Sequence, residues 1–288
     1  MNKQDVQKGT YTPSPNGGSR GPHEDAKQVR GVKDSPKKRE AFFWWEKFFD
    51  SNWKRLGFDS IAREETSQET DFLVKALELK PQDKVLDMAC GVGRHSLELA
   101  RRGFKNVTGL DFTQAYVKEA TLKASQEKLE VEFVQGDMKD LPFADESLDA
   151  VYNFYTSFGY FEGERDNEKV IKEASRVLKP AGRFLLDVVN RDWVVRNFQT
   201  RGWSEYNGEY LLEEREFDLA TSRNNCNWTY FAKDGTTKHE LSLRMYSLHE
   251  LVAMFARAGL EFKAAWGTLD REPLSLSHQR QKLLAVKS

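Results

Sequence analysis

The stretch VLDMACGVGRHSLELA, residues 85–100, combines the features of a ligand-binding turn. A short apolar run that contains an aspartate precedes Gly91 and Gly93, and an apolar helical pattern follows them. A parallel strand that turns directly into a helix holds nicotinamide dinucleotides, flavins or S-adenosylmethionine (SAM) at such a turn. The two glycines alone do not choose among these ligands.

The composition limits the class of protein. A chain of 288 residues with 39% hydrophobic residues is long enough to bury one sizeable core. We find no run of about 20 apolar residues and no secretory signal, so we expect a cytoplasmic protein that does not span a membrane. Two cysteines form neither a disulfide framework nor a zinc cluster, and we expect no metal. The net charge of −1 makes nucleic acid an unlikely partner.

Residues 1–40 differ in composition from the rest of the chain. They are rich in Gly, Pro, Ser, Lys and Asn and contain almost no aliphatic side chains. This composition predicts a disordered tail, because too little apolar area is available to offset the entropy of ordering. The alternative is a tail that docks on nucleic acid or on a partner through Lys37, Lys38 and Arg39.

Residues 41–80 are predicted to form an N-terminal helical cap on the main domain. Aromatic residues recur at helical spacing over residues 41–56. A second helix is expected to begin near Thr66, because Thr66 and Glu69 have the spacing of a capping box, and to end before Pro81.

The remainder of the chain predicts an α/β fold. Over residues 81–190 short apolar runs alternate with helical patterns, which predicts a doubly wound, Rossmann-like parallel sheet covered by helices. Residues 191–246 are predicted to form a small antiparallel β insertion, because residues 203–246 are strand-like without intervening helices and their KDGT sequence predicts a hairpin turn. Residues 247–288 resume the α/β pattern and complete the core. Strands are expected over 85–88, 107–110, 131–135, 148–153, 183–189, 260–266 and 282–286, and helices over 94–102, 114–127, 167–178 (capped by Asp166) and 247–258.

The residue at position 96 helps to choose the ligand. A dinucleotide site needs a third glycine there, so that a pyrophosphate can approach the helix, and this chain has Ser96. SAM has no phosphate and needs only the close backbone passage that Gly91 and Gly93 provide. Asp111 ends the second strand, where it can accept hydrogen bonds from ribose hydroxyls, and Asp137 ends the third, within reach of an adenine amino group. Asp111 would suit the ribose of NAD equally well, so Ser96 and Asp137 are the residues that favour SAM over NAD.

Five stretches of this chain, in this order and spacing, resemble the successive motifs of the class I SAM-dependent methyltransferases. They are VLDMACGVGRHSLELA, VTGLDFT, FVQGDMKDLPF, LDAVYNFYTSFGYF and RVLKPAGRFLLDVVN. The resemblance is strong over residues 66–190 and extends to residues 247–288 by the order of elements only. It implies a seven-stranded sheet with an antiparallel last strand, and SAM as the cofactor.

The resemblance also implies roles for residues at the strand ends. The implied cofactor-binding residues are Asp87, Ala89, Gly91, Gly93, Asp111, Phe112, Asp137, Met138 and Asn153. Phe112 and Met138 would sandwich the adenine, and Asn153 would lie near the sulfonium. Ala89 replaces the first glycine of the family motif. Arg63 is a candidate for binding the SAM carboxylate.

The sequence NFYTSFGYF, which follows the fourth strand, is where the resemblance places the methyl acceptor. It lacks the two prolines found in enzymes that methylate amines of DNA bases. Its side chains Tyr155, Phe158, Tyr160 and Phe161 predict an aromatic wall that suits an apolar or cationic small molecule. We assign Tyr155 and Tyr160 to acceptor positioning. His95 is a candidate base, with a hydrogen bond at the helix start as the alternative.

The predicted function is transfer of a methyl group from SAM to a small-molecule acceptor by in-line displacement, with nitrogen favoured as the acceptor atom. Alignment can supply about 7 kcal/mol or more of the catalysis. The alternatives are an RNA or peptide N-terminal methyltransferase, a non-catalytic SAM-binding protein and a nicotinamide oxidoreductase. The insertion carries Trp203, Tyr206, Trp228 and Tyr230, and it is expected to cover the site as a lid or to form a dimer interface. The chain is expected to be a monomer or a homodimer.

Overall fold

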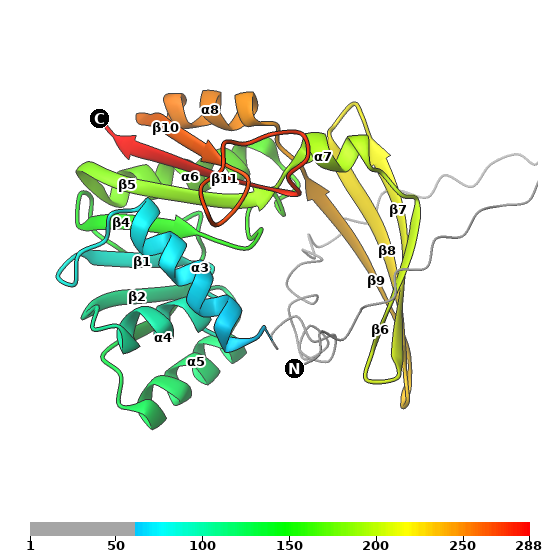
Figure 1. The fold of residues 1–288 in the computed structure, drawn as a ribbon, viewed down its shortest axis with the longest axis horizontal. Coiled ribbons are helices and arrows are strands. Elements are labelled where there is room, and N and C mark those ends of the chain that lie inside the picture. The colour runs from blue at the N-terminus through cyan, green and yellow to red at the C-terminus, as the bar shows by residue number, and fades with distance from the viewer. Residues whose placement is uncertain (1–60) are drawn as a thin grey trace, which may run out of the picture.

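The computed structural model describes residues 61–288, so the predictions for the tail 1–40 and for the aromatic helix 41–56 lie outside the described residues. Its main sheet contains β1 (Lys84–Met88), β2 (Asn106–Asp111), β3 (Glu132–Gln135), β4 (Leu148–Asn153), β5 (Leu178–Val189), β10 (Leu260–Trp266) and β11 (Arg280–Lys287). These seven strands lie in the order β10-β11-β5-β4-β1-β2-β3 (Figure 1). β11 runs antiparallel to both of its neighbours and the other six strands run parallel to one another, which confirms the predicted doubly wound sheet with an antiparallel last strand.

Helices cover both faces of the main sheet. The helices are α3 (Arg63–Ala76), α4 (Arg94–Arg101), α5 (Gln114–Glu127), α6 (Glu164–Val177), the short α7 (Arg191–Arg196) and α8 (Leu248–Arg257). Two apolar clusters form, one in which Phe184 packs on Phe255 of α8 and one in which Phe72 of α3 lies near Leu99 of α4. Val85 of β1 enters one cluster and Leu86 and Met88 enter the other, which is why a strand covered on both faces carries apolar residues on both sides.

Four further strands form a separate antiparallel sheet, which confirms the predicted β insertion. They are β6 (Arg201–Tyr206), β7 (Glu209–Asp218), β8 (Arg223–Ala232) and β9 (Gly235–Arg244). Figure 1 shows this sheet beside the end of the main sheet at which β5 leads into α7. Ala232 pairs with Gly235 across the two-residue loop between β8 and β9, at the predicted KDGT turn.

The small sheet is attached to the loop that follows β4. Nη2 of Arg223 donates hydrogen bonds to the carbonyls of Phe161 and Glu162, at 2.6 and 2.8 Å. The backbone N–H of Arg244 donates to the carbonyl of Gly159 at 2.9 Å, and a Cβ added at Gly159 would lie 2.3 Å from the Arg244 carbonyl oxygen. The backbone of β9 therefore packs directly on this loop.

The predicted start of α3 is wrong. The helix begins at Arg63 with Ala62 as its N-cap, three residues before Thr66. Thr66 and Glu69 are buried inside the helix, and both accept hydrogen bonds from Nη1 of Arg94 on α4. A three-residue spacing also places two polar groups on one helix face, and here that face contacts another helix.

The structure also corrects the elements around α6 and β5. The N-cap of α6 is Gly163, and Asp166 lies in the first turn. Residues 179–182, KPAG, lie between the predicted helix 167–178 and the predicted strand 183–189. They belong to β5, because this strand begins at Leu178 directly after α6. Ala181 has a φ of 61° and the register with β4 shifts here, which marks a bulge.

The turn between β1 and α4 needs left-handed backbone at three positions, Ala89, Gly91 and Gly93, with φ values of 63°, 58° and 77°. Gly93 also leaves room for a ring, because an added Cβ would lie 2.6 Å from the ring of Phe133. A Cβ at Gly109 would lie equally close, at 2.6 Å, so the Phe133 ring occupies a slot that both glycines leave open. Packing therefore explains Gly93 without any ligand.

Gly93→Ala should lower the free energy of unfolding by about 1–3 kcal/mol more than the control Gly103→Ala does, because it overpacks the slot of Phe133. Both glycines have positive φ, 77° and 89°, but nothing lies within 4 Å of a Cβ at Gly103. Urea unfolding followed by circular dichroism measures both losses. Equal losses would mean that the Phe133 ring moves aside without cost.

Candidate functional site

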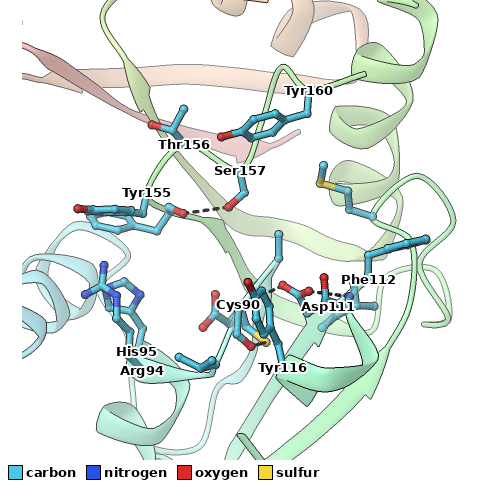
Figure 2. Close-up of a pocket in the computed structure, with 18 of the residues that line it drawn as sticks. Cys90, Arg94, His95, Asp111, Phe112, Tyr116, Tyr155, Thr156, Ser157 and Tyr160 are labelled. Atoms are coloured by element: carbon cyan, nitrogen blue, oxygen red, sulfur yellow. Dashed lines mark hydrogen bonds between the residues drawn. The ribbon is translucent and has the colours of Figure 1, made fainter. Parts of the chain in front are cut away.

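A cavity of about 370 Å³ opens at the carboxyl ends of β1, β2, β3 and β4. Ligands of doubly wound sheets bind at this edge, next to the point where the strand order reverses, and here that point lies between β1 and β4. The volume is within the range of about 300–1,000 Å³ that is usual for small-molecule sites. Figure 2 shows the side chains that line the cavity.

The turn after β1 forms the floor of the cavity. Asp87 is buried, and one of its carboxylate oxygens accepts a hydrogen bond from the Ser96 hydroxyl at 2.7 Å. Burial raises the pKa of Asp87, an effect that His95 and the Ser96 hydrogen bond oppose. Ala89 and Gly91 line the cavity, and a Cβ at Gly91 would meet nothing within 4 Å. The backbone is therefore open to a ligand at Gly91.

Asp111 joins the ends of β1 and β2. Its two carboxylate oxygens accept backbone N–H groups of Gly91 and Thr113, both at 2.8 Å. The residue is only 8% exposed, and burial raises its pKa. A carboxylate offers about four acceptor positions. The backbone N–H groups and the Thr113 hydroxyl use three of them, which leaves one for a hydroxyl group of a ligand.

Three further predicted residues line the cavity beside Asp111. Phe112 is 41% exposed, and Met138 is partly buried against the core. Asp137 accepts the backbone N–H of Lys139 at 2.8 Å, and the Lys139 ammonium lies 3.7 Å from its other oxygen. Two apolar side chains and an acceptor thus converge from the loops after β2 and β3.

Gly93 and Asn153 do not line the cavity. Asn153 is fully buried, and its amide donates to the carbonyl of Met88 at 2.8 Å, so that it joins the ends of β4 and β1. Arg63 also lies outside the lining residues. The contacts with SAM that we expected for these three residues stay predictions.

The loop after β4 has a strained backbone. Tyr155 and Thr156 have φ values of 66° and 63°, which residues other than glycine rarely adopt. The fully buried Asp187 fixes both residues: its carboxylate accepts the N–H of Tyr155 at 2.9 Å, and its carbonyl accepts that of Thr156 at 3.0 Å. The side chain of Tyr155 lines the cavity and is 39% exposed.

Arg280 of β11 also lines the cavity, and the sequence analysis missed it. Its Nε and Nη2 donate to the Asp187 carboxylate, at 3.1 and 2.5 Å, and its Cζ lies 5.0 Å from the centroid of the Tyr155 ring. Cζ of Arg94 lies at the same distance, 5.0 Å, from that ring. No local pattern marks Arg280, because the pairing of β11 with β5 brings it to the site.

His95 lines the cavity but is engaged with α3. Its Nε2 lies 2.9 Å from the carboxylate of Glu69, which also accepts a hydrogen bond from Arg94. Burial alone would raise the pKa of Glu69, but the hydrogen bonds from His95 and Arg94 outweigh it and lower this pKa to about 2. The partner of His95 is thus a carboxylate of the neighbouring helix.

The predicted aromatic wall is divided between cavity and core. Tyr155, Tyr160 and Phe161 line the cavity, whereas Phe158 packs on Tyr246 with ring centroids 5.2 Å apart. Burial raises the pKa of Tyr160 to about 12. None of the described residues of β6–β9 lines the cavity, so the lid function of this sheet stays a prediction.

Residues 61–288 contain no group of three or more His, Cys, Asp or Glu side chains placed to hold a metal ion. The helices in this part of the chain are also too short or too polar to cross a membrane.

Comparison with known proteins identifies the family. Residues 85–182 match the family model described as a methyltransferase domain. A demethylmenaquinone methyltransferase from Desulfitobacterium hafniense is 31% identical over 193 residues, which are 65% of this chain and 69% of that protein. The chain belongs to the class I SAM-dependent methyltransferases, the family that the sequence motifs predicted, whose cofactor is SAM.

Other relatives match over a smaller part or in fold alone. A sterol 24-C-methyltransferase from Gibberella zeae is 38% identical over 127 residues, 43% of this chain, and the chain spans only 31% of that protein's length. A SAM-dependent methyltransferase from Clostridium acetobutylicum has a similar structure, with a TM-score of 0.70 at 19% identity, over 85% of this chain and 99% of that one. This second likeness concerns the fold.

Glu69→Gln should destabilise the protein near neutral pH by an amount on the order of 3 kcal/mol, since one pKa unit corresponds to about 1.4 kcal/mol. The pKa of Glu69 falls from 4.5 to about 2 on folding, so its contribution is complete above pH 4.5 and is lost as the pH falls toward 2. Urea unfolding near pH 7 and near pH 3 should therefore give a smaller effect in acid. Glu65→Gln, at an exposed position of the same helix, is the control. An effect independent of pH would contradict this role of Glu69.

Proposed function

We propose that the protein transfers the methyl group of SAM to a small-molecule acceptor bound against the loop after β4. The observation that carries this proposal is the cavity itself, in which acids at the ends of β1 and β2 lie opposite the tyrosines of that loop. The two relatives are named for small acceptors, a sterol and demethylmenaquinone, and this also supports a small acceptor here.

One half of the cavity fits SAM. The open backbone at Gly91 leaves room for the part of the ligand next to the turn, and Asp111 retains an acceptor position for a ribose hydroxyl. Phe112 and Met138 offer apolar surfaces for an adenine ring, and Asp137 offers an acceptor for its amino group. The carboxylates also suit the positive charge of a sulfonium compound.

When bound, SAM supplies an activated methyl group: a lone pair of the acceptor forms the new bond to carbon while the carbon–sulfur bond breaks and leaves its electrons on sulfur. The protein's part is to align the acceptor and to exclude water. The fixed backbone of Tyr155 gives the acceptor a rigid wall. Tyr160 stays protonated at ordinary pH and acts there as a hydrogen-bond donor rather than as a base.

A proton released by the acceptor leaves to solvent or to His95. The Glu69 carboxylate accepts the hydrogen on Nε2 of His95 and holds the ring in place at the cavity wall. His95 is 5% exposed, so only a proton delivered at the cavity wall can reach it. Nitrogen, our preferred acceptor atom, would be bound as a neutral amine, because the guanidinium groups of Arg94 and Arg280 lie beside Tyr155.

Asp111→Ala should weaken SAM binding by about tenfold or more, since hydrogen bonds to a charged group are worth about 1.5–3 kcal/mol. Asp140→Ala, at an exposed position in the loop after β3, should leave it unchanged. Calorimetry with SAM and NAD measures binding, and radiolabelled SAM with fractionated cell extract measures turnover. Binding of NAD alone would contradict the cofactor. Tight SAM binding without any labelled product would favour a non-catalytic SAM-binding protein.

Tyr160→Phe should lower kcat/KM by about 2–10-fold, the value of one neutral hydrogen bond. The pH profile should keep its shape, because a pKa of about 12 keeps the hydroxyl protonated throughout the working range. Tyr210→Phe, at a position 42% exposed on β7, controls for loss of a hydroxyl elsewhere. If Tyr155→Phe and Tyr160→Phe both left turnover unchanged, the two hydroxyls would have no part in acceptor positioning.

A further inference from the structure

Negatively and positively charged side chains lie in different parts of the cavity lining. The carboxylates of Asp87, Asp111 and Asp137 belong to the ends of β1, β2 and β3. The two charged residues that contact the ring of Tyr155 are both arginines, Arg94 and Arg280. The half that suits the cationic cofactor is therefore acidic, and the half next to the loop after β4 is basic.

The carboxylates nearest to Tyr155 are already engaged. The Asp187 carboxylate accepts hydrogen bonds from the backbone of Tyr155 and from Arg280, and the Lys282 ammonium lies 3.7 Å from it. The Glu69 carboxylate contacts Arg94 and His95, and Glu65 lies at an exposed position of the same helix. A positively charged acceptor would meet two guanidinium groups here, and both buried carboxylates nearby, Asp187 and Glu69, are already paired.

Both arginines keep donors that the described residues do not use. Arg280 bonds Asp187 through Nε and Nη2, whereas its Nη1 donates to no residue that the structure describes. Its side chain is 27% exposed at the cavity. Nη2 of Arg94 is buried and likewise has no partner in the described part of the chain. Asp187 and the Tyr155 ring fix Arg280, so its remaining donors are held in place before a ligand arrives.

We propose that Arg280 binds an anionic group of the methyl acceptor, a carboxylate or an ionised hydroxyl, while the rest of the acceptor lies against Tyr155. This inference rests on the proposed function and names its substrate class. A guanidinium is suited to this task, because its parallel N–H groups match the geometry of an oxyanion. The SAM carboxylate has the same chemistry, so the experiment has to separate the two sources.

The test measures binding of three compounds with one ring and different charge to protein saturated with S-adenosylhomocysteine, the demethylated product of SAM. The compounds are benzoate, benzamide and benzylamine, which are anionic, neutral and cationic near neutral pH. Calorimetry should show benzoate binding at least about tenfold more tightly than benzamide, and benzylamine the most weakly. Arg280→Gln should abolish this order and change the affinity for S-adenosylhomocysteine by less than about twofold.

Two variants keep the result interpretable. Arg201→Gln removes an arginine on β6 that is 78% exposed, and it should preserve the order of binding. Arg280→Lys keeps a cation beside the buried Asp187 if the glutamine variant fails to fold. It should reduce the preference for benzoate, because an ammonium cannot present two parallel donors.

Three results would overturn the inference: benzylamine binding as tightly as benzoate, a preference for benzoate that survives in Arg280→Gln, or no preference in the parent protein. A loss of S-adenosylhomocysteine affinity in Arg280→Gln would instead assign the arginine to the cofactor, which also contradicts the proposal. Failure of the proposed function has a different signature, namely no binding of SAM or S-adenosylhomocysteine, or no methyl turnover, and the inference falls with it.

Discussion

The buried carboxylate of Asp187 connects three parts of the chain that are distant in sequence. It lies in β5, accepts the backbone of the loop after β4, and pairs with Arg280 and Lys282 of β11. A buried charge is tolerated only when nearly all of its acceptor positions are used, and here they are used by groups that also form the site. The left-handed backbone of Tyr155 and Thr156 is retained for the same reason, since both N–H groups find acceptors on Asp187. The hydrogen bonds and the ion pair of Asp187 thus offset both the strain at these residues and the burial of the carboxylate.

Much of the fold could be predicted from sequence, because its elements follow local rules. The bounds of α5 and β10 agree with the predicted 114–127 and 260–266. Errors arose where one local pattern has two structural explanations. Thr66 and Glu69 have the spacing of a capping box but line a helix–helix contact, and KPAG looks like a turn but forms a bulge inside β5. The short helix α7 has no strong pattern and was not predicted.

The residues of the candidate site likewise fall into some that the sequence predicts and some that it does not. Parallel strands end at one edge of their sheet, so an acid at the end of each strand is brought to the cavity by topology alone, and Asp87, Asp111 and Asp137 could be chosen from sequence. Arg280 could not, because its position depends on which strand β11 pairs with and in which register. Gly93 was predicted to bind the cofactor, but packing against Phe133 explains a glycine at this position without a ligand.

The contacts of Arg223 and Arg244 with the loop of residues 159–162 connect the small sheet to one wall of the cavity and leave the strand ends that carry the acids untouched. Two parts of the cavity wall, the loop of residues 159–162 and the strand ends with the acids, are therefore held by separate contacts. Changes in length or sequence within β6–β9 can shift the loop of residues 159–162 while the acids at the strand ends keep their positions. Under the proposed function, such an arrangement would let the acceptor side of the cavity vary with a peripheral segment while the methyl-donor side is retained.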